Sequence, residues 1–294
     1  MPELPEVETI KNQLAEKIIG KKIEKVKIFL PKMVKTPLNA FKRAILNSVI
    51  NNIQRRAKLI IVDLSCGYSL LIHLKMTGQL ITRRKQKTAN SKQQNKHTHL
   101  IFYLNDGNQL LFNDLRQFGY IKLLKTSEAE KLLEKEYGPE PLENNFTIKA
   151  FKNILMRKPM AKRKSFSKNP SFRPTGRKIK QFLMDQKNIA GIGNLYADEI
   201  LFFAGVMPTR KISTLTGKEI EKILAGIKKI LKEAIKYRGS SVDNYLDARG
   251  KTGEYHLRLK VYGRKGQPCK KCKTKIQKIK LAGRGTHFCP KCQK

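Results

Sequence analysis

The sequence has few acidic residues and no long apolar run, and its number of cysteines is odd, so they cannot all pair in disulfides within one chain. Its 23 aspartates and glutamates stand against 62 lysines and arginines, which gives a formal net charge of +39. No stretch reaches the about 18 consecutive apolar residues of a membrane-spanning helix, and the acidic N-terminus is unlike a signal or transit peptide. We therefore expect a cytoplasmic protein with no membrane partner.

The excess of positive charge predicts a polyanionic partner. A net charge of +39 over 294 residues favours binding to nucleic acid, although a ribosome-bound protein would share that charge. Two stretches concentrate it. The polar segment 83–96 holds six basic residues and no acid, and the segment 157–180 holds ten basic residues and no acid. Each segment is typical of a solvated cationic loop that attracts phosphates.

The five cysteines argue against a disulfide framework, because their number is odd and four of them cluster near the C-terminus. Cys269 and Cys272 form one Cys-x2-Cys pair, Cys289 and Cys292 form another, and 16 residues separate the two pairs. This spacing is typical of a four-thiolate zinc site. We expect one structural Zn²⁺ that fixes a β-hairpin with Arg284 at its tip.

The N-terminal half has the pattern of an antiparallel sandwich that carries a helix. Apolar residues recur at helical spacing from Pro5 to Ile19, and a short helix is expected over 38–46. Strand-like runs surround that short helix, and the turn signal 105–108 predicts a hairpin. The runs are 22–30, 49–64, 68–82, 99–104, 109–113 and 120–124.

The second half is mostly helical. The stretch Gly138-Pro139-Glu140-Pro141 ends a helix expected over 127–137 and marks a domain boundary. The patterns after it predict further helices over 146–156, 179–185, 194–204 and 216–237. The fold class is therefore α+β.

The chain begins with a potential nucleophile. If Met1 is removed, Pro2 becomes a secondary amine, with the carboxyl group of Glu3 beside it. A terminal amino group titrates near about 7.7–8.0 and a lysine near about 10.4, so the terminus more often presents a neutral amine. Schiff-base catalysis needs such an amine and a neighbouring acid or base. Taken alone, Pro5 and Glu6 are more typical of a plain helix start.

Two other short patterns are compatible with phosphate binding or catalysis. The stretch Gly191-Ile192-Gly193-Asn194 allows a tight turn that brings backbone N–H groups near an anion, but such turns are also common between helices. It is no dinucleotide fingerprint, because the third glycine is missing. Lys58 opens an apolar strand, where it could reach into a cleft or remain a solvated strand end.

Together these stretches carry the motifs of one family, in order from residue 2 to residue 293. They resemble the formamidopyrimidine-DNA glycosylases, and the opening residues are unlike those of the related endonuclease VIII branch. The matching stretches, besides the four cysteines, are 2–9, 54–58, 73–78, 114–119, 138–142, 191–199 and 261–264.

The resemblance implies an enzyme that removes oxidised purines, such as 8-oxoguanine and formamidopyrimidines, from double-stranded DNA in the bacterial cytosol or nucleoid, and then nicks the abasic strand. It implies that Pro2 attacks the sugar C1′ and that Glu3 donates a proton. Lys58 and Arg284 would be the donors for β- and δ-elimination, while Glu6 would order the terminus. The DNA-contacting residues that it implies are Met76, His97, Arg116, Phe118, Lys158 and Asn194.

A base inside a duplex hides its C1′, so the nucleotide must be extruded, at a cost of a few kcal/mol. Met76 and Phe118 can fill the gap as an apolar wedge, and Arg116 can donate to the orphaned cytosine. Without the resemblance, Met76 and Phe118 would be equally typical of core packing.

The resemblance also implies three domains in a monomer. A catalytic β-sandwich would cover 1–137, a helix-two-turn-helix DNA-binding domain 138–260, and a zinc finger 261–294. An insert at about 161–177 has no counterpart in the usual family pattern, and the region 239–255, which caps the extruded base in relatives, matches only loosely. An endonuclease VIII-like enzyme for oxidised pyrimidines and a non-catalytic zinc-dependent DNA-binding protein remain alternatives.

Overall fold

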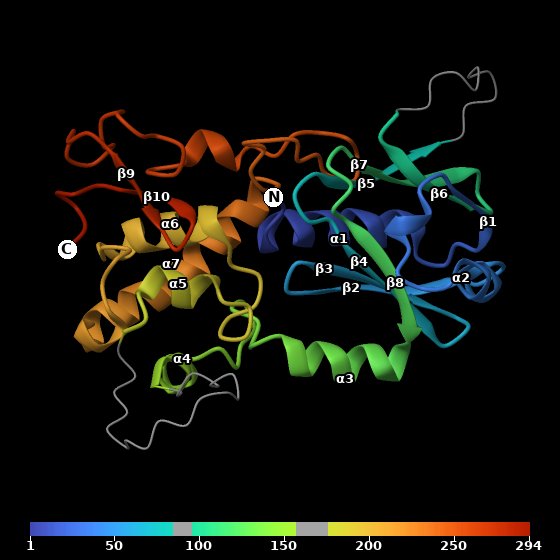
Figure 1. Ribbon diagram of the computed structural model, residues 1–294, viewed down its shortest axis with the longest axis horizontal. Coiled ribbons are helices and arrows are strands. Elements are labelled where there is room, and N and C mark those ends of the chain that lie inside the picture. The colour runs from blue at the N-terminus through green and yellow to red at the C-terminus, as the bar shows by residue number, and fades with distance from the viewer. Residues whose placement is uncertain (85–95, 157–175) are drawn as a thin grey trace. The chain divides into compact units, whose positions relative to one another are not determined.

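The protein consists of two compact units. The computed structural model describes residues 1–84, 96–156 and 176–294 (Figure 1). Unit 1 comprises Met1–Tyr137 and Glu233–Arg258, and unit 2 comprises Gly138–Lys232 and Leu259–Lys294. Helix α7, Gly217–Lys236, therefore begins in unit 2 and ends in unit 1. None of the helices in the described ranges is long and apolar enough to span a membrane.

Unit 1 contains two four-stranded sheets in which every pairing between strands is antiparallel. One sheet has the order β1-β6-β7-β5 and the other β2-β3-β4-β8. The expected runs 49–64 and 68–82 each divide into two strands. The strands are β1 (Ile23–Ile28), β2 (Ile50–Arg56), β3 (Leu59–Leu64), β4 (Tyr68–His73), β5 (Gly78–Arg84), β6 (Thr98–Leu104), β7 (Asn108–Asp114) and β8 (Tyr120–Lys125).

Strand β3 is apolar along most of its length because both of its faces are covered. Ile60 and Val62 point into the main core of the unit. Leu59 and Ile61 point to the opposite face, where they pack against Leu133 of helix α3 (Thr126–Glu136). Alternation of apolar and polar residues, the usual mark of a half-exposed strand, is therefore lost here.

Helix α1 (Leu4–Ile18) contributes four fully buried residues to the main core: Val7, Ile10, Leu14 and Ile18. Helix α2 (Leu38–Ile45) buries Phe41 and Ile45 in the same cluster. Since α1 packs along this core, the chain terminus that precedes it is held against a rigid element.

Unit 2 is helical and ends in a β-hairpin. The N-terminus of α7 has a capping box, in which the Thr216 hydroxyl accepts from Glu219 N and the Glu219 carboxylate accepts from Thr216 N. The other elements are α4 (Ile148–Met156), α5 (Ile179–Met184), α6 (Asn194–Ala204), β9 (Gln277–Leu281) and β10 (Arg284–Phe288). The α+β fold class predicted from the sequence, with a sandwich, a helical module and a C-terminal hairpin, is confirmed.

Candidate functional site

The N-terminal residues are buried and anchored. Pro2 lies in a buried position, and Glu3 and Glu6 are 4% and 2% exposed. The Glu6 carboxylate accepts from Glu3 N at 2.8 Å and from Ser240 N at 2.8 Å. One side chain therefore fixes both the start of α1 and a residue 234 positions away, so the expectation that Glu6 orders the terminus has a structural basis.

Gly239 makes this anchoring possible. Its φ is +77°, and a Cβ atom built on it would lie 2.8 Å from the Cγ and Oε1 atoms of Glu6. A side chain at residue 239 would therefore both strain the backbone and displace the carboxylate.

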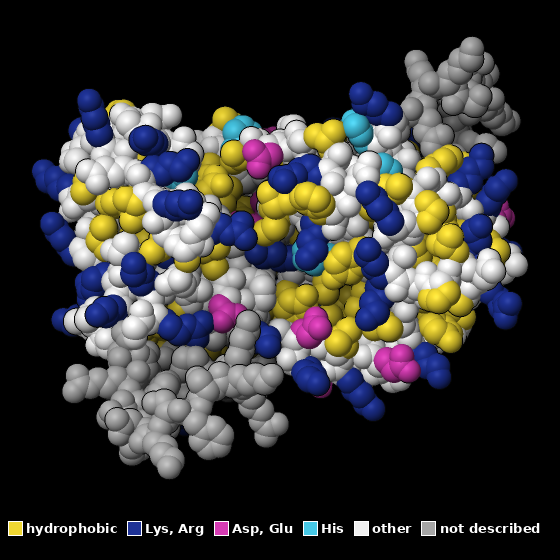
Figure 2. All heavy atoms as spheres, viewed as in Figure 1, with side chains coloured by type: hydrophobic (Ala, Val, Ile, Leu, Met, Phe, Trp, Pro, Cys, Tyr) yellow, Lys and Arg dark blue, Asp and Glu magenta, His cyan; other side chains and the backbone are white. Residues whose placement is uncertain are grey.

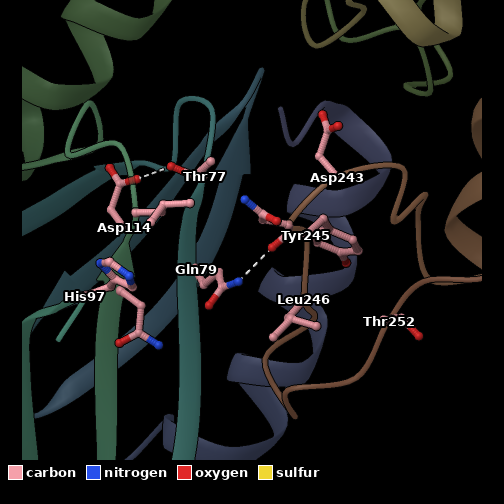
Figure 3. Close-up of a pocket in the computed structure, with 11 residues that line it drawn as sticks. Thr77, Gln79, His97, Asp114, Asp243, Tyr245, Leu246 and Thr252 are labelled. Atoms are coloured by element: carbon pink, nitrogen blue, oxygen red, sulfur yellow. Dashed lines mark hydrogen bonds between the residues drawn. The ribbon is translucent and has the colours of Figure 1, made fainter. Parts of the chain in front are cut away.

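A cavity of about 420 Å³ lies in unit 1 between the sheet and the segment that follows α7 (Figure 3). Gln79, His97 and Asp114 line one side, and Tyr245 and Leu246 line the other. The chain terminus lies next to this cavity. Met1 N is 3.8 Å from the carboxylate of Asp243, which also lines the cavity.

Asp114 organises the loop that carries Arg116 and Phe118. Its fully buried carboxylate accepts from the Thr77 hydroxyl, from Arg116 N and from Gly119 N. The Arg116 guanidinium lies 4.8 Å from the Phe118 ring centroid, and that ring is 54% exposed. An exposed aromatic side chain on a braced loop is compatible with the expected wedge.

Met76 is half-buried on the turn between β4 and β5, and His97 is half-buried in the turn directly before β6. The His97 carbonyl accepts from Asp114 N at 2.9 Å, so His97 is tied to the same brace as Arg116. Lys158 lies outside the described residues, as does most of the insert 161–177. Asp114 is the first residue of the motif 114–119, but the motif does not indicate what it does. Only the structure shows that its carboxylate braces the loop.

Lys58 lies in the turn between β2 and β3 and is 7% exposed, so it is not a solvated strand end. His73, paired with Leu59 across the sheet, is its electrostatic neighbour. Burial, and then the charges of Lys75 and Lys58, lower the pKa of His73 from 6.5 to about 3. A neutral ring agrees with the bond at 2.9 Å in which His73 Nδ1 accepts from Lys75 N.

The lowered pKa of His73 predicts acid sensitivity. Between about pH 3 and pH 6.5 the unfolded chain binds a proton that the folded chain does not, so stability is full above pH 6.5 and falls with decreasing pH. His73 alone should lower the free energy of unfolding by up to about 1.4 kcal/mol per pH unit in this window. Urea unfolding at several pH values should give a shallower decline for His73→Gln. Equal slopes in both proteins would contradict the prediction.

In unit 2 the structure places Asn194 beside the hairpin strand that begins with Arg284. Asn194 is the first residue of α6, and its Nδ2 donates to the carbonyl of Gly285 at 3.0 Å. Arg284 is exposed and begins β10 directly after the turn Ala282–Gly283, where both residues have positive φ. An amide nitrogen carries two N–H donors, so Asn194 keeps donor capacity beyond this bond.

A buried ion pair ties the helices to the hairpin. Lys180 on α5 is 1% exposed, and its Nζ lies 2.7 Å from Asp198 on α6 and 2.8 Å from the Thr286 hydroxyl on β10. Asp198 also accepts from His287 N at 2.8 Å. Glu199, next along α6, accepts from three successive backbone N–H groups at 260–262. These residues hold the hairpin tip beside the start of α6.

Replacing Asp198 with Ala should strongly destabilise unit 2. The change removes the carboxylate that lies 2.7 Å from the buried Lys180 ammonium, and breaking a buried ion pair costs about 3–5 kcal/mol. Thermal denaturation should show the loss, and adding Lys180→Met should restore most of it. A double variant as unstable as Asp198→Ala would contradict the ion-pair explanation.

The four expected cysteine ligands converge. Their Sγ atoms all lie within 4.8 Å of one another, with 3.9 Å between Cys269 and Cys292 and 3.4 Å between Cys272 and Cys289. Four thiolates at about 2.3 Å around a tetrahedral zinc ion lie about 3.8 Å apart, so the cluster fits Zn²⁺. The cysteines hold one structural zinc ion, as predicted.

The surface charge agrees with the composition. Figure 2 shows lysine and arginine side chains spread over the visible face, with few aspartates and glutamates among them. Such a surface attracts phosphate backbones through a salt-dependent, sequence-independent interaction.

Three family models match successive parts of the chain. They are the formamidopyrimidine-DNA glycosylase N-terminal domain over residues 1–121, the H2TH domain of the same enzymes over 137–245, and the zinc finger found in these glycosylases and in an isoleucyl-tRNA synthetase family over 266–294.

Curated relatives and solved structures agree with these models. The formamidopyrimidine-DNA glycosylase of Pelotomaculum thermopropionicum is 42% identical and covers 100% of this chain and 99% of that protein. The one from Listeria monocytogenes is 41% identical, with 100% of both covered. The Lactococcus lactis enzyme bound to DNA containing an abasic site superposes with a TM-score of 0.85 at 35% identity and 99% coverage of both chains.

The fold and the site together define a DNA-repair glycosylase with a zinc finger. The chain belongs to the formamidopyrimidine-DNA glycosylase family, over its whole length.

Proposed function

We propose that this protein removes oxidised purines, including 8-oxoguanine and formamidopyrimidines, from double-stranded DNA and then cleaves the abasic strand by β- and δ-elimination. The observation that carries the proposal is the position of the chain terminus. Pro2 and Glu3 are buried at the start of α1, and the terminus lies beside Asp243 of the 420 Å³ cavity. A nucleophile and a cavity able to hold a base therefore adjoin.

The chemistry follows from the terminal amine. After removal of Met1, the Pro2 nitrogen attacks C1′ of the extruded nucleotide, the bond to the damaged base breaks, and Glu3 donates a proton to the opening sugar. Cleavage of the bond between C1′ and the protonated ring oxygen leaves an iminium ion that joins Pro2 to C1′. On a preformed abasic aldehyde, Pro2 adds to the carbonyl carbon and water is lost instead. Lys58 and Arg284 then serve β- and δ-elimination. Proton transfer by positioned groups of this kind contributes about 10²–10⁴-fold to rate.

Extrusion of the nucleotide needs compensation in the duplex. Phe118, exposed on the loop braced by Asp114, and Met76 enter the gap, while Arg116 donates to the orphaned cytosine. His97, Asn194, Arg284 and Lys158 bind the DNA strand. The solved Lactococcus lactis relatives include complexes with abasic-site DNA and with N7-benzyl-Fapy-dG DNA, and these support the choice of lesion.

Borohydride trapping tests the proposal. Protein shown by mass spectrometry to lack Met1 is mixed with duplexes that contain one oxidised guanine, one oxidised pyrimidine or no lesion, and the imine is reduced. We expect a covalent adduct through Pro2 that forms fastest with oxidised guanine. A preference for the oxidised pyrimidine would favour the endonuclease VIII-like alternative, and binding without any adduct would leave a non-catalytic DNA-binding protein.

A further inference from the structure

The cavity in unit 1 has one rigid wall and one wall without regular secondary structure. Thr77 and Asn113 lie on or beside strands of the sheet. Asn244, Tyr245 and Leu246 lie on the segment between α7 and the short helix Tyr255–Arg258. The shape of the cavity therefore depends on what holds this segment, which we call the pocket segment (residues 240–253).

The pocket segment is fixed directly after Leu246. Ala248 has both of its backbone polar groups bound, since its N–H donates to Gln13 Oε1 at 2.9 Å and its carbonyl accepts from Thr82 N at 2.9 Å. Asp247, fully buried, accepts from Gln13 Nε2 at 3.0 Å. The Gln13 amide thus holds two consecutive residues, because its nitrogen donates to Asp247 and its oxygen accepts from Ala248.

Gln13 belongs to the helix that carries the proposed catalytic terminus. It is 8% exposed on α1, and Glu6 of the same helix holds Ser240 at the other end of the pocket segment. Residues 243–246, which form most of this wall of the cavity, lie between these two attachments (Figure 3). A second bond, from Gln79 Nε2 to the Asn244 carbonyl at 2.7 Å, joins the segment to β5.

We infer that Gln13 is a positioning residue for the base-binding cavity, acting through Asp247 and Ala248. Its amide keeps Tyr245 and Leu246 in place against the extruded base, while Gln13 itself touches no substrate. The inference rests on the proposed function, because it assigns the cavity to the base that is excised. The Gln13 amide donates and the Asp247 carboxylate accepts, so the amide and the carboxylate can be exchanged between the two positions.

The swap uses Gln13→Glu, Asp247→Asn and the double variant. Gln13→Glu places a second carboxylate against that of Asp247 in a buried site. Asp247→Asn leaves a single side-chain oxygen where two carboxylate oxygens accepted, one from Gln13 Nε2 and the other from Arg249 N and Lys251 N. In the double variant, the amide introduced at position 247 donates to the carboxylate introduced at position 13, which still accepts from Ala248 N. The net charge of the pair is then the same as in the parent protein, and Arg238, which lies 3.6 Å from Asp247 Oδ2, keeps its ion pair with Glu254.

The readout compares two substrates under single-turnover conditions. A duplex with one oxidised guanine needs the base to be seated, whereas a duplex with a preformed abasic site has no base to seat. We expect Gln13→Glu to slow excision by at least about tenfold, to change nicking of the abasic site by less than about twofold, and to be rescued in the double variant to within about threefold of the parent.

Asn12→Asp is the matched control, since it adds the same charge at the neighbouring, exposed position of α1. It should excise like the parent. Parental excision by Gln13→Glu, an equal fall in excision and nicking, or a double variant as slow as the single one would each overturn the inference. A parent protein that nicks abasic DNA but excises no oxidised purine would instead refute the proposed function itself, and the inference with it.

Discussion

Protein that retains Met1 is expected to lose strand nicking and imine trapping, by at least about a thousandfold relative to the processed protein. With Met1 in place the Pro2 nitrogen is part of a peptide bond, and its lone pair is delocalised into the carbonyl. The retained residue therefore removes the proposed nucleophile while leaving Glu3 and α1 unchanged in sequence. Nicking of abasic-site duplex and borohydride trapping measure the loss, on protein whose N-terminus is verified by mass spectrometry.

Binding supplies the control for this result. Affinity for a duplex with a non-cleavable abasic analogue should be nearly unchanged, because the basic surface and the zinc hairpin remain intact. Undiminished nicking by protein that is fully Met1-blocked would rule out Pro2 as the nucleophile. A parallel fall in duplex affinity would point to a disturbed fold at the terminus.

Removal of zinc is expected to weaken duplex binding by at least about tenfold while unit 1 stays folded. The residues around the metal site form a small apolar cluster, with Phe202, Val261 and Ile276 beside two of the cysteines. A cluster of this size cannot stabilise the hairpin by itself. The binding free energy of a structural zinc ion, about 10–16 kcal/mol in zinc-finger peptides, supplies the rest. Arg284 and Gly285 would then lose their fixed position beside Asn194.

Two variants make the zinc test specific. Cys272→Ser should reproduce the effect of chelation in a fluorescence binding assay, whereas Cys66→Ser should not, because Cys66 is exposed and lies outside the cluster. Circular dichroism should still report the sandwich, whose core is separate from the metal cluster. Full affinity after verified removal of zinc would show that the hairpin is dispensable for binding.

Local patterns in the sequence predicted much of the secondary structure and the zinc ligands. The turn signal at 105–108 and the helical spacing in α1 and over 216–237 each act between near neighbours in the chain, so they can be recognised without the fold. The cysteine spacing is likewise a local constraint, and the structure brings those four side chains together as predicted. The terminal Pro2-Glu3 pair could also be proposed from its position alone.

What the sequence by itself determined is therefore where the main helices and the strand-forming runs lie, the zinc ligands and, through its motifs, the family. Only the tertiary structure decided that Glu233–Arg258 belongs with the N-terminal unit, that Gln13 holds Asp247, and that Lys180 pairs with Asp198. These contacts join residues 18 to 234 positions apart. No local periodicity encodes such a partner, because burial and hydrogen-bond satisfaction depend on which surfaces the folded chain brings together.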